Sequence, residues 1–254
     1  MPLWSIIAVS AVGACVICTA LFFLLRPKYI AYKYDEADRF LLNEFGRCNV
    51  MVFGKKRQGK DLIFAHVIAM RGVKHYANIP YDENTEVIEL SELNVGDNTF
   101  KDFINGTIEP FSPRFDEGLD VFVSDCGIYL PCHYNAELNA KYPSMPIFFA
   151  LSGQLYDMRV HINSQALGRP WDKLREQADS YIQVLRTVPR DEYLYTTIVC
   201  YDKYTNAEHE TNPIAKYTVR IPISELTYDS RYFREFLFDC PPSTQDYLEN
   251  IIWR

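Results

Sequence analysis

The residues whose types and spacing point most clearly to chemistry lie in a glycine-rich loop. Gly54, Gly59 and Lys60 follow the spacing Gly-x-x-x-x-Gly-Lys, between an apolar run and an apolar segment of helical pattern. This is the arrangement of a phosphate-binding P-loop, in which successive backbone N–H groups and a helix N-terminus face one anion. Lys60 is expected to reach the β- and γ-phosphates of a nucleoside triphosphate. The predicted nucleotide-binding residues are Gly54, Lys55, Lys56, Arg57, Gln58, Gly59, Lys60 and Asp61.

One position departs from the P-loop pattern. Asp61 stands where a Ser or Thr usually contacts Mg²⁺. Its carboxylate is either a direct Mg²⁺ ligand or a cap for the helix N-terminus, and the sequence leaves both interpretations open. A negative charge here would compete with phosphate, although the basic run Lys55–Arg57 could offset it. The alternative for the whole loop is a solvated basic turn between two core elements.

A second candidate for metal chemistry is Asp125, which closes the strand-like segment Asp120–Asp125 after the apolar residues Val121, Phe122 and Val123. At the C-terminal end of a strand beside the P-loop strand, this carboxylate would hold Mg²⁺ through water, which is the Walker B role. Asp61 and Asp125 are therefore the predicted metal ligands. Many ring ATPases follow this Asp with a Glu that orients the attacking water. Here Cys126 follows, and because a thiol is largely protonated at neutral pH, hydrolysis is either absent or dependent on another group.

Three further residues are candidates for a role at the γ-phosphate. Gln165 follows the strand-like segment Arg159–Ser164, where its amide could orient water, or it is an ordinary loop residue. Arg169 and Arg175 could act as arginine fingers toward a neighbouring subunit. The alternative for both is a surface charge paired with a nearby Asp. Lys60, Asp125, Gln165 and Arg175 are the predicted catalytic residues, whereas His161 is interpreted as structural.

The N-terminal segment predicts a membrane anchor. Trp4–Leu25 carries no charge and is long enough for a helix to span a bilayer core of about 30 Å. Arg26 and Lys28 follow it, and the short flank before it has no Lys or Arg. The positive-inside rule then predicts a single-pass protein of the bacterial inner membrane with its C-terminal domain in the cytoplasm. A signal peptide, or a lipoprotein signal ending at Cys15, would normally carry a basic n-region, which is missing here.

Composition restricts the other function classes. The net charge of −7 does not suit a protein that coats nucleic acid, so any DNA contact is expected to be local. The seven Cys residues show no zinc spacing, and Cys48, Cys126 and Cys200 lie in or beside apolar strands, which fits a reduced compartment.

Alternating strand and helix patterns predict an α/β fold with a three-layer sheet. The expected domains are residues 1–33, the transmembrane helix and its flanks; 34–190, a P-loop ATPase domain; and 191–254, a C-terminal extension of β-strands and tail. The predicted strands are Cys48–Phe53, Val73–Ile79, Glu86–Leu90, Leu119–Ser124, Arg159–Ser164, Tyr181–Arg186, Tyr193–Tyr201 and Lys216–Ile223. The predicted helices are Leu62–Met70, Thr99–Ile104, His133–Lys141, Pro146–Tyr156 and Pro170–Ala178.

The order of these motifs resembles the zonula occludens toxin-like proteins of filamentous phages and prophages, which belong with the FtsK/HerA-type P-loop ATPases. The resemblance covers roughly residues 46–205. It is carried by Gly54…Gly59-Lys60, by Val121–Asp125 and by the strand-Gln-x-x-x-Arg-x-x-Asp-Lys-x-x-Arg segment that runs from Gln165 to Arg175.

The resemblance implies a membrane-bound ATPase that uses ATP and Mg²⁺ to assemble or extrude phage particles, or to move their single-stranded DNA, across the host inner membrane. It implies a homo-oligomeric ring, in the family a hexamer, with phage coat and assembly proteins as partners. By position, Lys60 is the Walker A lysine, Asp125 the Walker B aspartate and Gln165 the γ-phosphate sensor. Asp61, Cys126 and the N-terminal position of the membrane segment depart from the family pattern.

Two other functions remain open at this point. Asp61 and Cys126 favour a membrane-anchored scaffold whose P-loop binds nucleotide weakly or without turnover. A DNA-translocating ATPase of conjugation or partition is the third possibility, although such enzymes usually carry additional DNA-reading modules.

Overall fold

The structure of the chain, a computed structural model, describes residues 17, 19–21, 33–94 and 118–226. Internal contacts divide the chain into two units, Met1–Leu41 and Leu42–Arg254, each described by itself. In the first unit, residues 17, 19–21 and 33–41 are helical. Most of the predicted membrane segment, Trp4–Leu25, lies outside the described residues. Among the helices that are described, none combines the length and apolar character needed to cross a bilayer.

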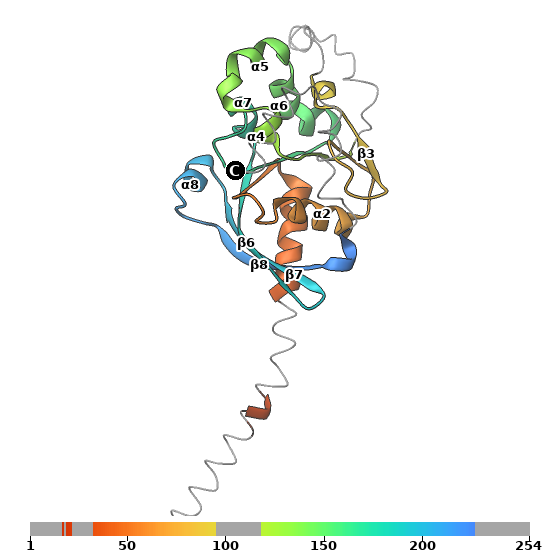
Figure 1. The fold of residues 1–254 in the computed structure, drawn as a ribbon, viewed down its shortest axis with the longest axis vertical. Helices are drawn as coiled ribbons and strands as arrows, with labels where there is room; N and C mark the ends of the chain where they lie inside the picture. Colours follow the sequence, from red (N-terminus) through yellow and green to blue (C-terminus); the bar gives the residue numbers. More distant parts are fainter. Residues whose placement is uncertain (1–16, 18, 22–32, 95–117, 227–254) are drawn as a thin grey trace, which may run out of the picture. The chain divides into compact units, whose positions relative to one another are not determined.

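The second unit is built on a mixed sheet of eight described strands (Figure 1). Their order across the sheet is β3-β2-β4-β5-β1-β6-β7-β8. Neighbours from β3 to β6 pair in parallel, and β6, β7 and β8 pair antiparallel. The strands are β1 (Val50–Phe53), β2 (His75–Ala77), β3 (Thr85–Val87), β4 (Val121–Val123), β5 (Val160–Ser164), β6 (Ser180–Arg190), β7 (Tyr193–Tyr201) and β8 (Ala215–Pro222).

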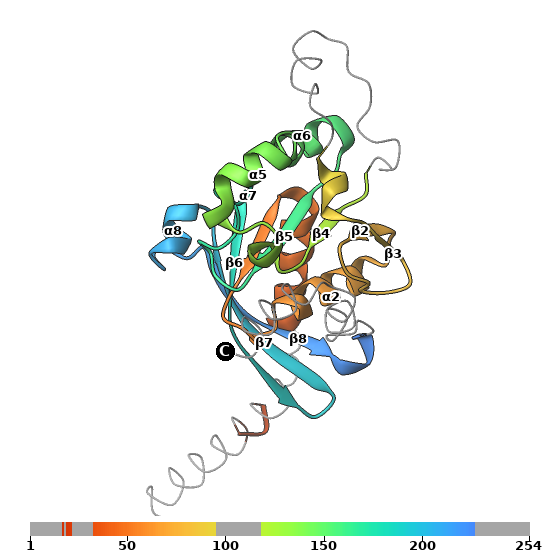
Figure 2. The same cartoon turned by 45° about the horizontal axis from the view of Figure 1, so that its top comes forward.

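Helices lie on both faces of this sheet, as Figure 2 shows for α2 on one face and α5 and α6 on the other. On the α2 face, Phe64 contacts Phe122 of β4 edge-to-face, with ring centroids 5.2 Å apart. On the opposite face, the core cluster includes Met51, Phe148 and Trp171. The helices are α2 (Lys60–Arg71), α4 (Cys126–Tyr129), α5 (Asn135–Lys141), α6 (Met145–Tyr156), α7 (Asp172–Arg175) and α8 (Tyr204–Glu208), with 3₁₀ turns η1 (Leu90–Leu93), η2 (Cys132–Tyr134) and η3 (Ile223–Glu225).

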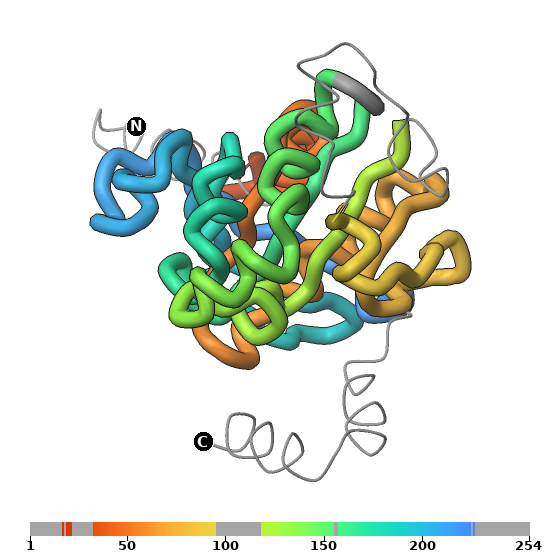
Figure 3. The backbone as a smooth tube through the Cα atoms, turned by 90° about the horizontal axis from the view of Figure 1, so that it is seen from above, coloured from red at the N-terminus to blue at the C-terminus, as the bar shows by residue number. Residues whose placement is uncertain are grey.

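The strand that precedes the P-loop is the clearest case of sequence dictating position. All four residues of β1 are buried, because helices cover the sheet on both sides and a parallel strand in such a sheet is apolar throughout. Seen from above in Figure 3, the green tube of α5 and α6 lies over the sheet, with the yellow η1 segment beside it. The Ser144 backbone N–H donates to Asn94 Oδ1 at 2.9 Å and ties these two segments together.

The predicted three-layer α/β arrangement and the antiparallel C-terminal strands are therefore present, but one predicted neighbourhood was wrong. Asp125 follows β4, and β4 does not lie beside the P-loop strand, because β5 lies between them. The apolar character of a strand is visible in its own residues, whereas the order of the strands depends on how the crossovers between them pack.

Several predicted boundaries also shift. The helix predicted over Pro170–Ala178 is only the short α7, and the strand predicted over Glu86–Leu90 is the shorter β3 followed by η1. Two helices, α4 and α8, were not predicted. The predicted helix Thr99–Ile104 and the tail Ser230–Arg254 lie outside the described residues.

Candidate nucleotide-binding site

The glycine-rich loop connects the end of β1 to the start of α2, as the sequence predicts. Gly59 has a left-handed backbone with φ of 93°, and a Cβ at this position would overlap the Thr187 hydroxyl of β6. A Cβ at Gly54 would lie 2.5 Å from the Val184 carbonyl oxygen, also on β6. Both glycines are therefore required because the loop lies directly against the neighbouring strand.

Hydrogen bonds within the loop, and one from β6, occupy groups of the loop that could otherwise face a phosphate; we call this the closed loop. Gln58 Oε1 accepts the Lys55 backbone N–H at 2.7 Å, and the Gln58 carbonyl accepts the Thr187 hydroxyl at 2.7 Å. The buried Lys60 directs its ammonium toward the Lys55 carbonyl, 3.4 Å away. The Gln58 amide oxygen thus occupies one of the backbone donors that a P-loop would offer to a phosphate oxygen.

Asp61 lies in the first turn of α2, but its carboxylate is engaged elsewhere. Its Oδ1 accepts hydrogen bonds from Asn163 Nδ2 at 2.7 Å, from the Ser124 hydroxyl at 3.1 Å and from the Tyr81 hydroxyl at 3.3 Å. The N-cap position, Gly59, has no side-chain cap. Of the two interpretations left open by the sequence, the described contacts therefore place the carboxylate toward the ends of β4 and β5 and not over the helix N-terminus.

Asn163 connects the two acidic residues. Its Nδ2 donates to Asp61 Oδ1, and its Oδ1 accepts the Asp125 backbone N–H at 2.8 Å. Asn78 fixes the same edge from the other side, because its side chain accepts the Ser124 N–H at 2.7 Å and donates to the Ser124 carbonyl at 3.0 Å. Four residues of this network were not predicted from the sequence: Asn163, Ser124, Asn78 and Tyr81. The available signal was a polar residue, Asn163, inside a buried strand one position before its end.

Asp125 combines an unusual backbone with an unusual charge environment. It has φ of 48°, in the left-handed region, where it begins α4. Burial, followed by the charge of Asp61, raises the pKa of the Asp125 carboxyl to about 6, and Lys60 and Lys56 act in the opposite direction. The predicted P-loop lysine and the two predicted metal ligands therefore lie within electrostatic reach of one another.

Cys126 does not face this site as a base would. Its side chain is fully buried within the core cluster between the sheet and the α5–α6 layer. Burial and the neighbouring Asp125 raise the pKa of the Cys126 thiol to about 12. The thiol therefore stays protonated at neutral pH, and the position after Asp125 supplies no general base.

The other predicted catalytic residues have partners away from the loop. Gln165 accepts a hydrogen bond from Arg169 Nη1 at 3.3 Å. Arg175 donates to the Gly168 carbonyl at 3.2 Å and lies over the Tyr204 ring, 5.1 Å from its centroid. Among the described residues, the contacts of Gln165 and Arg175 do not include the P-loop, so their roles toward nucleotide stay predictions.

His161 lies at the opposite end of the strands, in a structural setting. Its Nδ1 accepts the Val50 N–H at 3.3 Å, so the proton is on Nε2, 3.6 Å from Asp120 Oδ2. Burial, together with the charges of Arg71 and Arg159, lowers the pKa of His161 well below its usual value. The ring is therefore neutral, and it packs 4.8 Å from the Phe122 ring, centroid to centroid.

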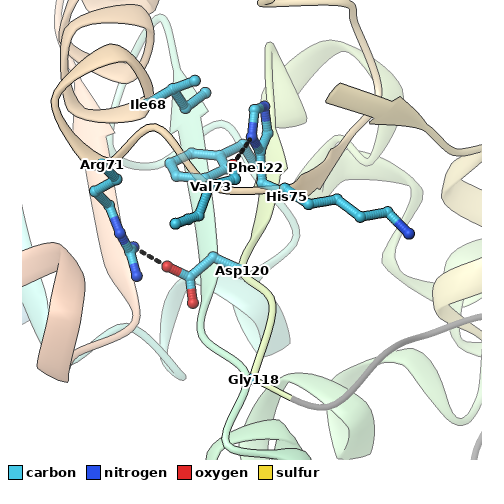
Figure 4. A pocket seen from close by; sticks show the side chains of 8 residues that line it. Ile68, Arg71, Val73, His75, Gly118, Asp120 and Phe122 are labelled. Atoms are coloured by element: carbon cyan, nitrogen blue, oxygen red, sulfur yellow. Dashed lines mark hydrogen bonds and ion pairs between the residues drawn. The ribbon is translucent and has the colours of Figure 1, made fainter. Parts of the chain in front are cut away.

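A shallow hollow lies at this same end of the strands (Figure 4). Arg71 and Asp120 form an ion pair at its wall, and His75 Nδ1 lies 3.1 Å from the Val73 carbonyl. Asp120 precedes β4, whereas Asp125 follows it. The hollow is thus separated from the acidic pair by the length of the strand, and it does not belong to the candidate site. Its lining residues are Ile68, Arg71, Val73, Lys74, His75, Gly118, Asp120 and Phe122.

The donor set fits Mg²⁺ bound together with a triphosphate. Among the residues that the structure describes, no group of three or more His, Cys, Asp or Glu side chains is arranged to hold a metal ion. Two carboxylates, Asp61 and Asp125, are hard oxygen ligands of the kind Mg²⁺ uses, and Mg²⁺ in nucleotide sites is commonly held by one or two carboxylates plus phosphate oxygens and water.

No protein-family model matches the chain, and no curated protein sequence does. Solved structures that are similar include the genome packaging NTPase B204 from Sulfolobus turreted icosahedral virus 2 in complex with AMP, at 10% identity and a TM-score of 0.38 over 68% of this chain and 98% of that chain. The N-terminal domain of zonular occludens toxin from Neisseria meningitidis matches at 12% identity and a TM-score of 0.36, over 73% and 97% of the two chains. EssC (ATPases 2 and 3) from Geobacillus thermodenitrificans matches at 10% identity and a TM-score of 0.40, over 80% and 44%.

Proposed function

We propose that this chain is a membrane-anchored P-loop ATPase that binds ATP with Mg²⁺ and drives assembly or extrusion of a filamentous phage, or export of its single-stranded DNA. The observation that carries the nucleotide part is the position of Lys60 and Asp61, at the start of the helix that follows β1, within electrostatic reach of Asp125 at the end of β4. This juxtaposition of one lysine and two carboxylates at one edge of a sheet supports the proposal, because these are the side-chain types that hold phosphate and Mg²⁺ in nucleotide sites.

The phage-related part rests on the resemblance of the motif order to zonula occludens toxin-like proteins. The same resemblance supports a homo-oligomeric ring, possible contact with phage coat and assembly proteins, and single-stranded DNA as cargo. The uncharged segment Trp4–Leu25 supports a location in the host inner membrane with the ATPase domain in the cytoplasm.

The test is ATP binding and turnover by the full-length chain in detergent, with Mg²⁺ and with or without single-stranded DNA. Lys60→Ala should abolish turnover and weaken ATP binding at least tenfold, because the lysine is expected to contact the β- and γ-phosphates. The matched control is Lys203→Ala, which removes an exposed lysine before α8. Equal loss in both variants, or no loss in either, would contradict the proposal.

A second function is favoured by one observation, the burial of Cys126. Because this residue supplies no base, the chain could bind ATP without hydrolysing it and serve as a nucleotide-gated scaffold. Binding that depends on Lys60 but shows no turnover under any condition would support this scaffold, or a base supplied by a neighbouring subunit. A conjugation-type DNA pump is separated from both by DNA-stimulated turnover with double-stranded DNA.

A further inference from the structure

We propose that this site admits a triphosphate only together with a divalent cation, because Asp61 makes the cation-free site repel phosphate. The inference deepens the proposed function and rests on it. In an ordinary P-loop the residue at this position is a neutral Ser or Thr, so cation-free nucleotide meets no fixed negative charge there.

The carboxylate of Asp61 is fixed in place and cannot easily turn away from a bound phosphate. Three side-chain donors, from Asn163, Ser124 and Tyr81, converge on Oδ1. A rotation that moved the carboxylate into solvent would remove the acceptor that these buried side chains share, although the Ser124 hydroxyl would keep its contacts with the Tyr81 hydroxyl and with Asn163 Nδ2. Because unmade hydrogen bonds of buried groups are costly, Asp61 is expected to keep its position when ligand arrives.

The three donors also determine which oxygen of the Asp61 carboxylate is available to a cation. Among the described residues, the hydrogen bonds to the Asp61 carboxylate all go to Oδ1 and none goes to Oδ2. Oδ2 is thus the oxygen left for a cation, and the carboxylate is oriented before any ligand binds. Such preorganisation lowers the cost of binding, since the ligand group need not be ordered at that moment.

The second carboxylate strengthens the same effect. Asp125 lies at the end of β4, at the same edge of the sheet as Asp61. Asn163 holds both residues, one through its carboxylate and the other through its backbone N–H. Two carboxylates, bridged by Asn163, therefore lie at the edge of the sheet where α2 begins with Lys60. Adding a triphosphate alone adds further negative charge at short range, whereas adding it with a divalent cation does not.

Neither the divalent cation nor the triphosphate is expected to bind well without the other. Two carboxylates leave most positions of an octahedral Mg²⁺ unfilled. The phosphate oxygens would complete the coordination, and the cation would cancel the repulsion. Cation and triphosphate should therefore bind with strong positive coupling.

The experiment measures binding of a fluorescent ATP analogue to the full-length chain in detergent, in excess Mg²⁺ and in EDTA at pH 7.5. The wild-type affinity should be at least about 100-fold higher with Mg²⁺. In Asp61→Ser, which restores the usual hydroxyl, the affinity in EDTA should rise by about tenfold or more, because one fixed charge is removed from the phosphate site. The ratio of the affinity in Mg²⁺ to the affinity in EDTA should therefore be smaller in Asp61→Ser than in wild type.

Two further variants separate the effect of the Asp61 charge from the effect of its side-chain shape and from a general loss of negative charge. Asp61→Asn keeps the size of the side chain and an oxygen acceptor, so it should behave as Asp61→Ser does in EDTA. Asp191→Ser removes an exposed acid at the turn between β6 and β7 and should leave both affinities unchanged. Circular dichroism checks that each variant is folded.

The outcomes distinguish this inference from the proposed function. If wild type binds equally well in Mg²⁺ and EDTA, or if both Asp61 variants keep the wild-type ratio, the inference is wrong although the site binds nucleotide. If wild type binds in neither condition, the proposed function itself fails. Should both variants prove unfolded, the wild-type ratio alone decides, since a value near one overturns the inference.

Discussion

At the scale of single residues, the closed loop leads to a prediction about Gln58. Its amide oxygen accepts the Lys55 N–H and must release it before a phosphate can bind there. Gln58→Ala should therefore raise ATP affinity about three- to tenfold, the equivalent of one hydrogen bond of about 1 kcal/mol. Titration of the full-length chain with a fluorescent ATP analogue in Mg²⁺ measures the change.

The control for Gln58→Ala is Gln154→Ala, an exposed glutamine on α6, which should leave affinity unchanged. A fall in affinity in Gln58→Ala would mean that the side chain keeps the loop in its binding-competent shape. The bond from the Thr187 hydroxyl to the Gln58 carbonyl persists in either case, because it involves the backbone of Gln58.

Asp125 gives a prediction about pH. Its pKa of about 6 exceeds the usual value for Asp of about 3.9, so the folded chain holds this proton more tightly than the unfolded chain. The resulting stabilisation is fully present below about pH 4 and is lost as the pH rises through about 6. In cation-free buffer, Asp125→Asn should therefore be more stable than wild type by about 1–2 kcal/mol at pH 7.5, and the difference should shrink toward pH 4.

Urea unfolding at pH 4.5 and pH 7.5 measures this difference, with Asp191→Asn as a control at an exposed turn. A difference between Asp125→Asn and wild type that does not depend on pH would show that the effect is one of packing. Adding Mg²⁺ and ATP should reverse the order of stability, since the variant loses a predicted metal ligand.

Individual residues were predictable where a local pattern fixes them. Lys60 and Asp61 follow from the loop motif, and Asp125 follows from the end of an apolar strand. Asn163 and Tyr81 could not be assigned to Asp61 in this way, because their contacts depend on which strands lie side by side and span 102 and 20 residues of chain.

At the scale of elements, one side chain connects the start of the P-loop strand to three other segments. Asn49 Oδ1 accepts the Val160 N–H of β5 at 2.9 Å, and its Nδ2 donates to the Phe149 carbonyl of α6 at 3.2 Å and to the Gln177 carbonyl at 3.4 Å. The register of β1 against β5 depends on these contacts. The position of the P-loop relative to Asp125 depends on that register.

Asn49→Ala should lower the free energy of unfolding by about 1–3 kcal/mol, because it leaves partly buried backbone groups without partners. Urea unfolding measures it. Asn206→Ala removes a single side-chain bond to Asp202 on the surface and should cost about 0.5 kcal/mol or less. Equal effects of the two substitutions would contradict the role assigned to Asn49.

The elements themselves were predicted best where the chain is apolar. β1, β7 and α6 coincide closely with their predicted segments. Strand order was not predictable in the same way, because the position of β5 between β1 and β4 is set by crossover packing. That insertion brings Asn163 between the P-loop and Asp125, and so explains why the polar network was missed.

At the scale of the whole molecule, membrane anchoring stays a prediction. The full-length chain should remain with the membrane fraction after carbonate extraction. Replacing both Val12 and Val16 by Lys should release it, because each charge in the middle of a spanning helix costs about 2.5–3.5 kcal/mol. Replacing both by Leu is the matched control and should change nothing. Release of the unmodified chain by carbonate would exclude a spanning anchor.

One hydrogen bond gives the closed loop a consequence beyond nucleotide affinity. Gln58 is bonded through its side chain to the loop and through its carbonyl to Thr187, in the long strand β6 that continues into the hairpin with β7. The Thr187 hydroxyl also lies 2.9 Å from the Thr196 hydroxyl on β7. Because these hydrogen bonds link the loop to both strands of the hairpin, we expect a movement of the loop on phosphate binding to displace the hairpin as well.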